Sequence, residues 1–91
     1  MNEKIKVNEA TNQFELETPE GLALITYEIQ GNAISIMHTE VPEAAEGQGI
    51  GSELAGFALD YARQKQLKVQ VYCKFVQAYL QKHPQYQDLI S

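Results

Sequence analysis

A turn with three glycines in five positions, Gly47, Gly49 and Gly51, is the stretch of the sequence best suited to chemistry. Strand-like alternation precedes it and helical spacing follows it, so the turn enters a helix without a clear side-chain cap. The first N–H groups of a helix have no partner inside the helix and point outward with the positive end of its dipole. Glycine lets an anion approach such a backbone closely. The turn therefore predicts a phosphate or pyrophosphate site; the alternative is a glycine-rich turn that only reverses the chain.

Two common phosphate-binding loops do not match this turn. A Walker loop requires Lys and then Ser or Thr after its last glycine, whereas Ser52 and Glu53 follow Gly51. A Rossmann fingerprint requires a third glycine where this chain has Leu54, and it follows the first strand of a parallel sheet. Neither class of nucleotide-binding protein is indicated.

The residues before the turn alternate in the manner of antiparallel strands. Apolar and polar residues alternate at residues 5–7 and 14–17, and residues 22–30 are rich in Ile, Thr and Tyr. Gly31 and Asn32 form a two-residue hairpin connection to a fourth strand over residues 33–40, which Pro42 ends. Strict alternation in this strand predicts Ile34, Ile36 and His38 on one face, with Ser35, Met37 and Thr39 on the other.

The residues after the turn predict a long helix, a strand and a shorter helix. Residues 48–65 carry a single apolar stripe at helical spacing, made of Ile50, Leu54, Phe57, Ala58, Tyr61 and Ala62. Residues 67–73 alternate as a fifth strand, and a right-handed crossover through the helix makes it parallel to the fourth. Residues 75–83 predict the second helix, with a final turn docked after Pro84. The chain is thus expected to be one α+β domain, residues 1–91, with a mixed, mostly antiparallel sheet of about five strands.

Length and charge exclude several classes of function. The 91 residues can bury only a small core, so a large multilayer enzyme is excluded. The formal net charge of −5, without a basic run, argues against nucleic acid or an anionic membrane as a partner. A polar N-terminus without a signal sequence and a lone cysteine, Cys73, indicate a cytoplasmic protein without an internal disulfide. No His, Cys, Asp and Glu residues have the spacing of a metal site.

The order of these segments resembles the GNAT superfamily of N-acetyltransferases, and more narrowly its short YjdJ-type subfamily. The resemblance extends from Ile34 to Ile90. It rests on residues 38–42 (His-Thr-Glu-Val-Pro), 47–51 (Gly-Gln-Gly-Ile-Gly), 67–69 (Leu-Lys-Val), 73–76 (Cys-Lys-Phe-Val) and 83–89 (His-Pro-Gln-Tyr-Gln-Asp-Leu). It implies a minimal version of the superfamily's acyl-CoA N-acyltransferase core.

The resemblance implies that acetyl-CoA is the cosubstrate. The glycine turn and helix start would take the pyrophosphate, and the end of the fourth strand would pair its backbone with the pantetheine arm. The implied contacts are Thr39, Glu40, Val41, Gly47, Gln48, Gly49, Ile50, Gly51 and Ser52. The superfamily usually has Arg or Gln where this chain has Glu46, and a carboxylate there opposes a diphosphate. We therefore expect Glu46 to turn outward and the affinity to be modest.

Acetyl transfer to an amine needs a deprotonated amine, a stabilised oxyanion and a proton for the leaving thiolate. In the superfamily the fourth and fifth strands splay apart around the thioester, and Cys73 ends the fifth strand. Its thiolate could take the acetyl group first, with His38 as base, or His38 could deprotonate an amine directly. Tyr79 lies where the superfamily often places a proton donor. The alternatives are a buried apolar cysteine, a core histidine and a tyrosine that only packs.

Three functions remain open at this stage. The first is an acetyl-CoA-dependent N-acetyltransferase for an unidentified amine; the second is a coenzyme A-binding module without turnover, such as a sensor or subunit. The third is a structural domain that keeps the loop and binds nothing. Superfamily elements that help form the acceptor site are missing here, so we expect an acceptor pocket that is shallow or completed by a partner. The protein is expected to be a monomer or a weak homodimer.

Overall fold

The computed structural model describes residues 4–90, so the expectation of a polar N-terminus without a signal sequence lies partly outside the described residues. The elements in chain order are β1 (Lys6–Asn8), β2 (Gln13–Thr18), β3 (Gly21–Gln30), β4 (Ala33–Glu40), a 3₁₀ turn η1 (Glu43–Ala45), α1 (Ile50–Gln64), β5 (Lys68–Val71), α2 (Lys74–Lys82) and a 3₁₀ helix η2 (Pro84–Leu89). Within this range, no helix has the length and apolarity needed to cross a membrane.

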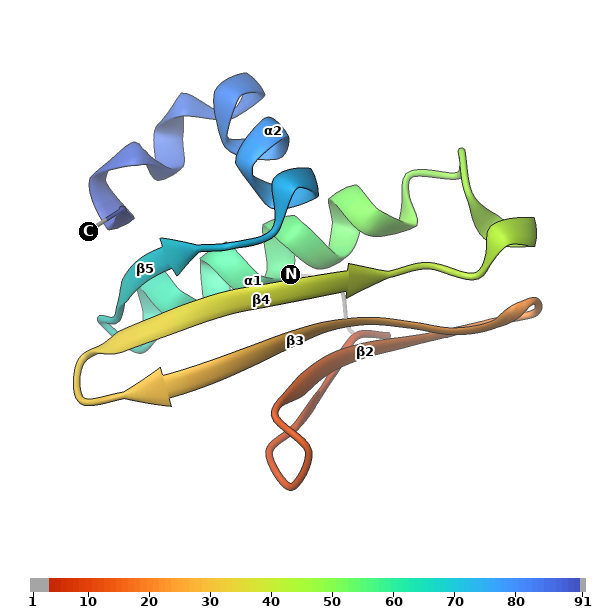
Figure 1. Ribbon diagram of the computed structural model, residues 1–91, viewed down its shortest axis with the longest axis horizontal. Helices are drawn as coiled ribbons and strands as arrows, with labels where there is room; N and C mark the ends of the chain where they lie inside the picture. Colours follow the sequence, from red (N-terminus) through yellow and green to blue (C-terminus); the bar gives the residue numbers. More distant parts are fainter. Residues whose placement is uncertain (1–3, 91) are drawn as a thin grey trace.

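The five strands form one sheet in the order β1-β2-β3-β4-β5. The first four are antiparallel neighbours, and β5 runs parallel to β4. The helix α1 lies across one face of this sheet, and α2 with η2 follows β5 at one edge (Figure 1). The predicted mixed sheet, α+β class and crossover from β4 through α1 to β5 are therefore confirmed.

The core lies between the sheet and α1. Side chains that point from the strands toward the helix are fully buried at Phe14, Ile25, Ile34, Ile36 and Val69. Burying a side chain of this size contributes about 1.5–3 kcal/mol. The predicted stripe of α1 meets them, since all its members are buried except the half-buried Tyr61. This packing fixes both the tilt of α1 and the position of its first turn beside β4.

A β-bulge in β4 overturns one prediction about the sheet. Thr26 pairs with His38 and the next residue, Tyr27, pairs with Ile36, so Met37 is an extra residue in β4. A bulge of this kind reverses the alternation of side chains beyond it. The prediction that His38 shares a face with Ile34 and Ile36 is wrong: His38 is exposed on the uncovered face, and Thr39 points to the inner side instead.

Polar contacts hold the C-terminal segment against the last turns of α1. The Tyr86 hydroxyl donates to Asp60 Oδ1 at 2.8 Å. The guanidinium of Arg63 donates two bonds to the Asp88 carboxylate, at 2.9 and 3.0 Å, and one to the Gln85 carbonyl oxygen at 2.8 Å. These contacts fix η2 beside α1, and η2 in turn adjoins α2, which follows β5.

Candidate functional site

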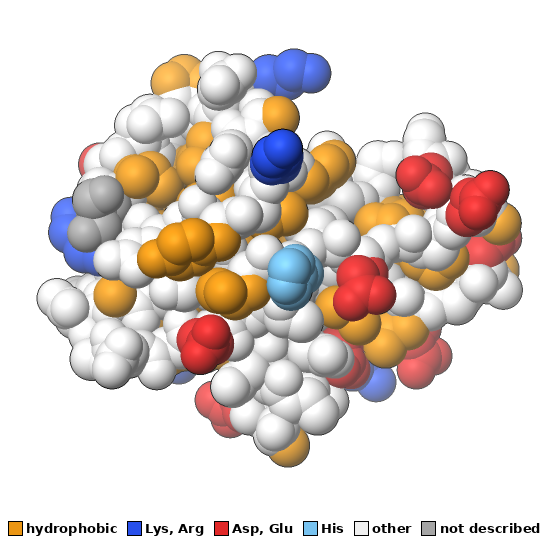
Figure 2. Space-filling model, in the orientation of Figure 1, with side chains coloured by type: hydrophobic (Ala, Val, Ile, Leu, Met, Phe, Trp, Pro, Cys, Tyr) orange, Lys and Arg blue, Asp and Glu red, His pale blue; other side chains and the backbone are white. Residues whose placement is uncertain are grey.

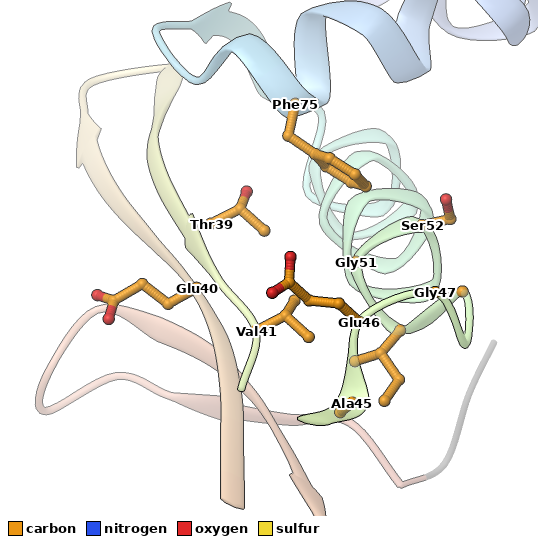
Figure 3. Close-up of a pocket in the computed structure, with 11 residues that line it drawn as sticks. Thr39, Glu40, Val41, Ala45, Glu46, Gly47, Gly51, Ser52 and Phe75 are labelled. Atoms are coloured by element: carbon orange, nitrogen blue, oxygen red, sulfur yellow. The ribbon is translucent and has the colours of Figure 1, made fainter. Parts of the chain in front are cut away.

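A pocket of about 630 Å³ opens between the end of β4, the connection after it and the first turn of α1. Figure 3 shows its walls: Thr39 on β4 and Val41 directly after it, Gly51 and Ser52 on α1, and Phe75 at the start of α2. The edge of β4 that faces β5 is left without a ladder partner here, because the pairing of these strands ends at Ile36 and Val71. Free backbone groups on a strand edge can bind an extended ligand.

The start of α1 is built from backbone alone. Gly49 is its N-cap residue, with φ of 78°, and it makes no side-chain capping bond. The first bond of the helix runs from Glu53 N to the Gly49 carbonyl oxygen, so the preceding amides have no partner within the helix. Gly47 also has a positive φ, 85°, and a Cβ at either glycine would meet open space. Backbone conformation, and not crowding, therefore requires glycine at these two positions.

At Gly51 the constraint is crowding by a neighbouring side chain. A Cβ at this position would lie 2.7 Å from Cζ of Phe75, which is closer than side-chain atoms approach in proteins. The Phe75 ring lies directly over the first turn of α1 and forms a wall of the pocket, although the side chain is 45% exposed. The glycine thus lets α2 and α1 enclose the pocket together.

The Glu46 side chain does not turn outward as expected. It lines the pocket, and its carboxylate points into the space between Thr39 and Gly51 (Figure 3). This orientation agrees with the general preference of carboxylates for the N-terminal end of a helix. An anionic ligand bound at the same place would have to displace it.

Beyond the last β4–β5 hydrogen bond, from Tyr72 N to the Ile36 carbonyl oxygen, the two strands separate. The next contact between them joins side chains: Thr39 Oγ1 lies 3.1 Å from Cys73 Sγ, and either atom can donate. Cys73 is 8% exposed and is the N-cap residue of α2, where it makes no side-chain capping bond. Since Thr39 also lines the pocket, the sulfur lies one hydrogen bond behind the pocket wall.

His38 and Cys73 are not brought into contact. The bulge places His38 on the face of the sheet away from α1, where it is exposed, so the alternative of a core histidine is wrong. Its backbone N–H donates to Thr26 Oγ1 at 3.1 Å. The residue that contacts the sulfur is Thr39, for which only a backbone role was expected.

Tyr79 lies deeper between the helices. The Tyr79 hydroxyl lies so close to the α1 backbone that a Cβ added to Gly56 would be only 2.9 Å from it. The Tyr79 ring stacks on the His83 ring, with centroids 3.8 Å apart. Burial, and to a lesser degree the charge of Asp60, raise the pKa of Tyr79 above its ordinary value of 10.0. The residue is absent from the lining of the pocket. This environment favours the packing alternative for Tyr79.

Eight of the nine implied coenzyme contacts line the pocket; Gln48 does not. The lining also contains Ala45, Glu46 and Phe75, which were not among those contacts. Phe75 comes two residues after the expected end of the fifth strand at residue 73. This was a usable signal, because a strand parallel to the fourth ends on the same side of the sheet as the glycine turn. Among residues 4–90, no group of three His, Cys, Asp or Glu side chains is arranged to hold a metal ion.

Comparison with known proteins finds a matching family model and several curated relatives. Residues 13–89 match the family model described as GCN5-related N-acetyl-transferase. The chain is 40% identical over 63 residues to Protein NATD1 of Gallus gallus, which covers 68% of this chain and 57% of that protein. It is 37% identical over 71 residues to Protein NATD1 of Danio rerio, covering 75% and 64% of the two chains. The matched segment thus spans little more than half the length of these curated relatives.

A solved structure extends the match over nearly the whole chain. The solution structure of a "GCN5-like putative N-acetyltransferase" from Staphylococcus aureus superimposes with a TM-score of 0.74 at 32% identity, covering 99% of this chain and 91% of that one. The family model, the relatives and this structure agree on the family, and the structure also agrees with the fold described above. The chain belongs to the GCN5-related N-acetyltransferase family.

Proposed function

We propose that this protein is an acetyl-CoA-dependent N-acetyltransferase. The observation that carries the proposal is the pocket of about 630 Å³ in which the uncapped start of α1 faces the unpaired edge of β4. The amides of Ile50, Gly51 and Ser52 would bind the diphosphate, and the β4 edge near Thr39 would pair with the pantetheine arm. Glu46 would swing out of the pocket on binding, which lowers the affinity.

Cys73 is proposed as the first acceptor of the acetyl group. Its sulfur attacks the thioester carbonyl, a C–S bond to Cys73 forms, the bond to the coenzyme sulfur breaks, and the Cys73 proton passes to the leaving sulfur. An amine then attacks the acetyl-cysteine carbonyl; the C–N bond forms, the C–S bond breaks, and one amine proton returns to Cys73. The Thr39 hydroxyl, 3.1 Å from Sγ, positions the thiol in both steps.

His38 is proposed to act on the side of the acceptor. It is exposed on the sheet face away from α1, and it directly follows the bulge residue Met37 where β4 leaves β5. A histidine there can accept the proton that an ammonium group must lose before it attacks. In this arrangement His38 serves the amine and Thr39 serves the thiol, so the two residues act on opposite faces of the sheet.

The binding step is tested by titrating acetyl-CoA into the protein while amide NMR shifts are followed. Shifts should centre on residues 47–52 and on Thr39. Their absence at millimolar ligand would reject coenzyme binding altogether.

The chemical step is tested by thiol release with a panel of amines. We expect Cys73→Ala to lower turnover by about a hundredfold or more, the range typical for loss of a nucleophile, without abolishing the coenzyme shifts. Mass analysis should locate an acetyl group on the peptide that contains Cys73. Retained turnover in Cys73→Ala would exclude the covalent route and favour direct attack.

A coenzyme A-binding module without turnover is the second candidate. The observations that favour it are the separation of His38 from Cys73 on opposite faces and the carboxylate of Glu46 inside the pocket. Coenzyme-dependent shifts without thiol release across the amine panel would select it.

A further inference from the structure

The face of the sheet that α1 does not cover contains a second hollow. It measures about 510 Å³ and is called the sheet-face groove below. Its lining includes Glu28 and Ile29 of β3, Ser35 and Met37 of β4, Gln70 of β5, and Tyr72 just after β5. Figure 2 shows apolar side chains gathered on this face. Ile29 is 45% and Tyr72 61% exposed, so the groove is open to solvent along its length.

The sheet-face groove ends at the opening between β4 and β5. Met37 is the bulge residue of β4, and Tyr72 makes the last backbone bond between the two strands. Directly beyond them the strands separate, and Thr39 and Cys73 meet across the opening. A molecule lying in the groove would therefore approach the sulfur from the face opposite to the coenzyme pocket.

The lining of the groove has two chemically different ends. Near the opening, Met37 and Tyr72 offer apolar surface. At the far end lies the carboxylate of Glu28, which is exposed and has no hydrogen bond or ion pair with any residue in the range 4–90. No Lys or Arg side chain lines the groove. A cation is therefore favoured at the Glu28 end and a hydrocarbon segment beside it.

The polar groups of the groove are oriented as acceptors. The Tyr72 hydroxyl and the Ser35 hydroxyl both donate to Gln70 Oε1, at 3.2 and 3.4 Å. These bonds fix the Tyr72 ring against the strand and leave its oxygen lone pairs free for a donor. Glu28 faces Ser35 across the β3–β4 ladder, and the opening begins about three residues further along β4. With a rise of about 3.3 Å per residue, the two ends are on the order of 10 Å apart.

We propose that the sheet-face groove binds the acetyl acceptor and that this acceptor is a linear aliphatic diamine, polyamines included. One ammonium group pairs with Glu28, the methylene chain lies on Met37 and Tyr72, and the other amine reaches the opening. That amine gives up a proton to His38, attacks the acetyl carbonyl to form the C–N bond, and releases the thiol as the C–S bond breaks. The inference rests on the acetyl-transfer function proposed above and adds the class of acceptor.

The kinetic test compares amines that differ only in the second charge. With saturating acetyl-CoA, thiol release is measured for butylamine, hexylamine, putrescine, cadaverine and spermidine. We expect kcat/KM for the better diamines to exceed that of monoamines of matched length by about tenfold, the effect of one charge-assisted hydrogen bond. The variant Glu28→Gln should reduce this preference to nearly one. The control Glu20→Gln alters an exposed carboxylate in the β2–β3 turn and should leave the preference unchanged.

A binding test separates the inference from the proposed function. Spermidine is titrated into the protein without coenzyme, and shifts are expected at residues 28–29, 35–37 and 70–72 and should weaken in Glu28→Gln. Shifts spread over acidic residues on other faces, or an equal kcat/KM for monoamines and diamines, would overturn the groove proposal while coenzyme binding stands. Shifts of groove residues that depend on protein concentration, in the absence of any amine, would also overturn the groove proposal. They would show that a second copy of the chain covers this face of the sheet. Failure of acetyl-CoA to shift residues 47–52 would instead reject the proposed function.

Discussion

The polar groups at the two ends of α1 are arranged in opposite ways. At the C-terminal end, polar side chains of the helix are paired with the segment that returns over it: Asp60 with Tyr86, and Arg63 with Asp88. At the N-terminal end, Gly49 leaves the backbone without a side-chain cap, and the carboxylate that lies nearby points into a pocket. Paired polar groups stabilise the fold, whereas unpaired ones are available to a ligand. The contrast predicts that changes at one end affect binding and changes at the other affect stability.

The largest effect on binding is expected from Gly51→Ala. The new Cβ would lie 2.7 Å from Phe75 Cζ, so the ring that walls the pocket must move. Overpacking of this kind costs about 1–3 kcal/mol, and we expect acetyl-CoA affinity to fall by about thirtyfold, equivalent to about 2 kcal/mol. Calorimetric titration measures the change.

The control is a double-mutant cycle with Phe75→Ala, which removes the atom that the new Cβ meets. In that background Gly51→Ala should cost much less affinity, since the clash is gone. Additive losses would show that Gly51 acts through the helix backbone and not through Phe75.

At the other end, Tyr86→Phe should reduce stability and not binding. It removes the 2.8 Å hydrogen bond to the Asp60 carboxylate beneath a buried ring. Loss of a bond to a charged group costs about 1.5–2 kcal/mol, which urea unfolding at neutral pH would detect. Acetyl-CoA affinity should stay within about twofold of the wild type, because a change of this kind far from the pocket leaves the site intact. A large loss of acetyl-CoA affinity in Tyr86→Phe would contradict the prediction that the C-terminal end of α1 affects stability and not binding.

The same tyrosine predicts a dependence on high pH. Burial, and then the hydrogen bond to Asp60, raise the pKa of Tyr86 from 10.0 to about 12. Because the folded state holds the phenol protonated, its contribution to stability is complete below pH 10 and is lost as the pH rises from 10 toward 12. The wild type should therefore lose stability more steeply than Tyr86→Phe over this interval. Parallel pH profiles would contradict the assignment.

The contrast between the ends also marks what the sequence could reveal. Periodicity located the strands and α1, and the glycine spacing located the pocket, because these features depend on neighbouring residues. The bulge at Met37 depends on how β4 pairs with β3, so no local signal placed Thr39 beside Cys73 and turned His38 to the other face. The direction of the Glu46 side chain was likewise mispredicted, because repulsion from a diphosphate is only one influence on a carboxylate there and the nearby helix N-terminus favours negative charge.

A smaller effect is expected from Glu46→Gln. The carboxylate lines the pocket and would repel a diphosphate there, so its neutralisation should raise acetyl-CoA affinity by about fivefold at low salt. The gain should shrink as salt is added, since screening already weakens the repulsion in the wild type. Glu43→Gln is the matched control, because this exposed residue of η1 does not line the pocket. An equal gain in both variants would point to net charge rather than to the position of Glu46.

The smallest effect is expected from Arg63→Ala, at the C-terminal end. Hydrogen bonds from the Arg63 guanidinium lower the pKa of the Asp88 carboxyl. The side chains of Arg63 and Asp88 are nevertheless 45% and 65% exposed. Water and salt screen such a pair, so the loss of stability should be smaller than for Tyr86→Phe and should fall further at high salt. Paired urea unfolding curves at low and high salt measure this. A loss that exceeds that of Tyr86→Phe and persists at high salt would mean that the bond from Arg63 to the Gln85 carbonyl, and not the ion pair, fastens η2 to the helix.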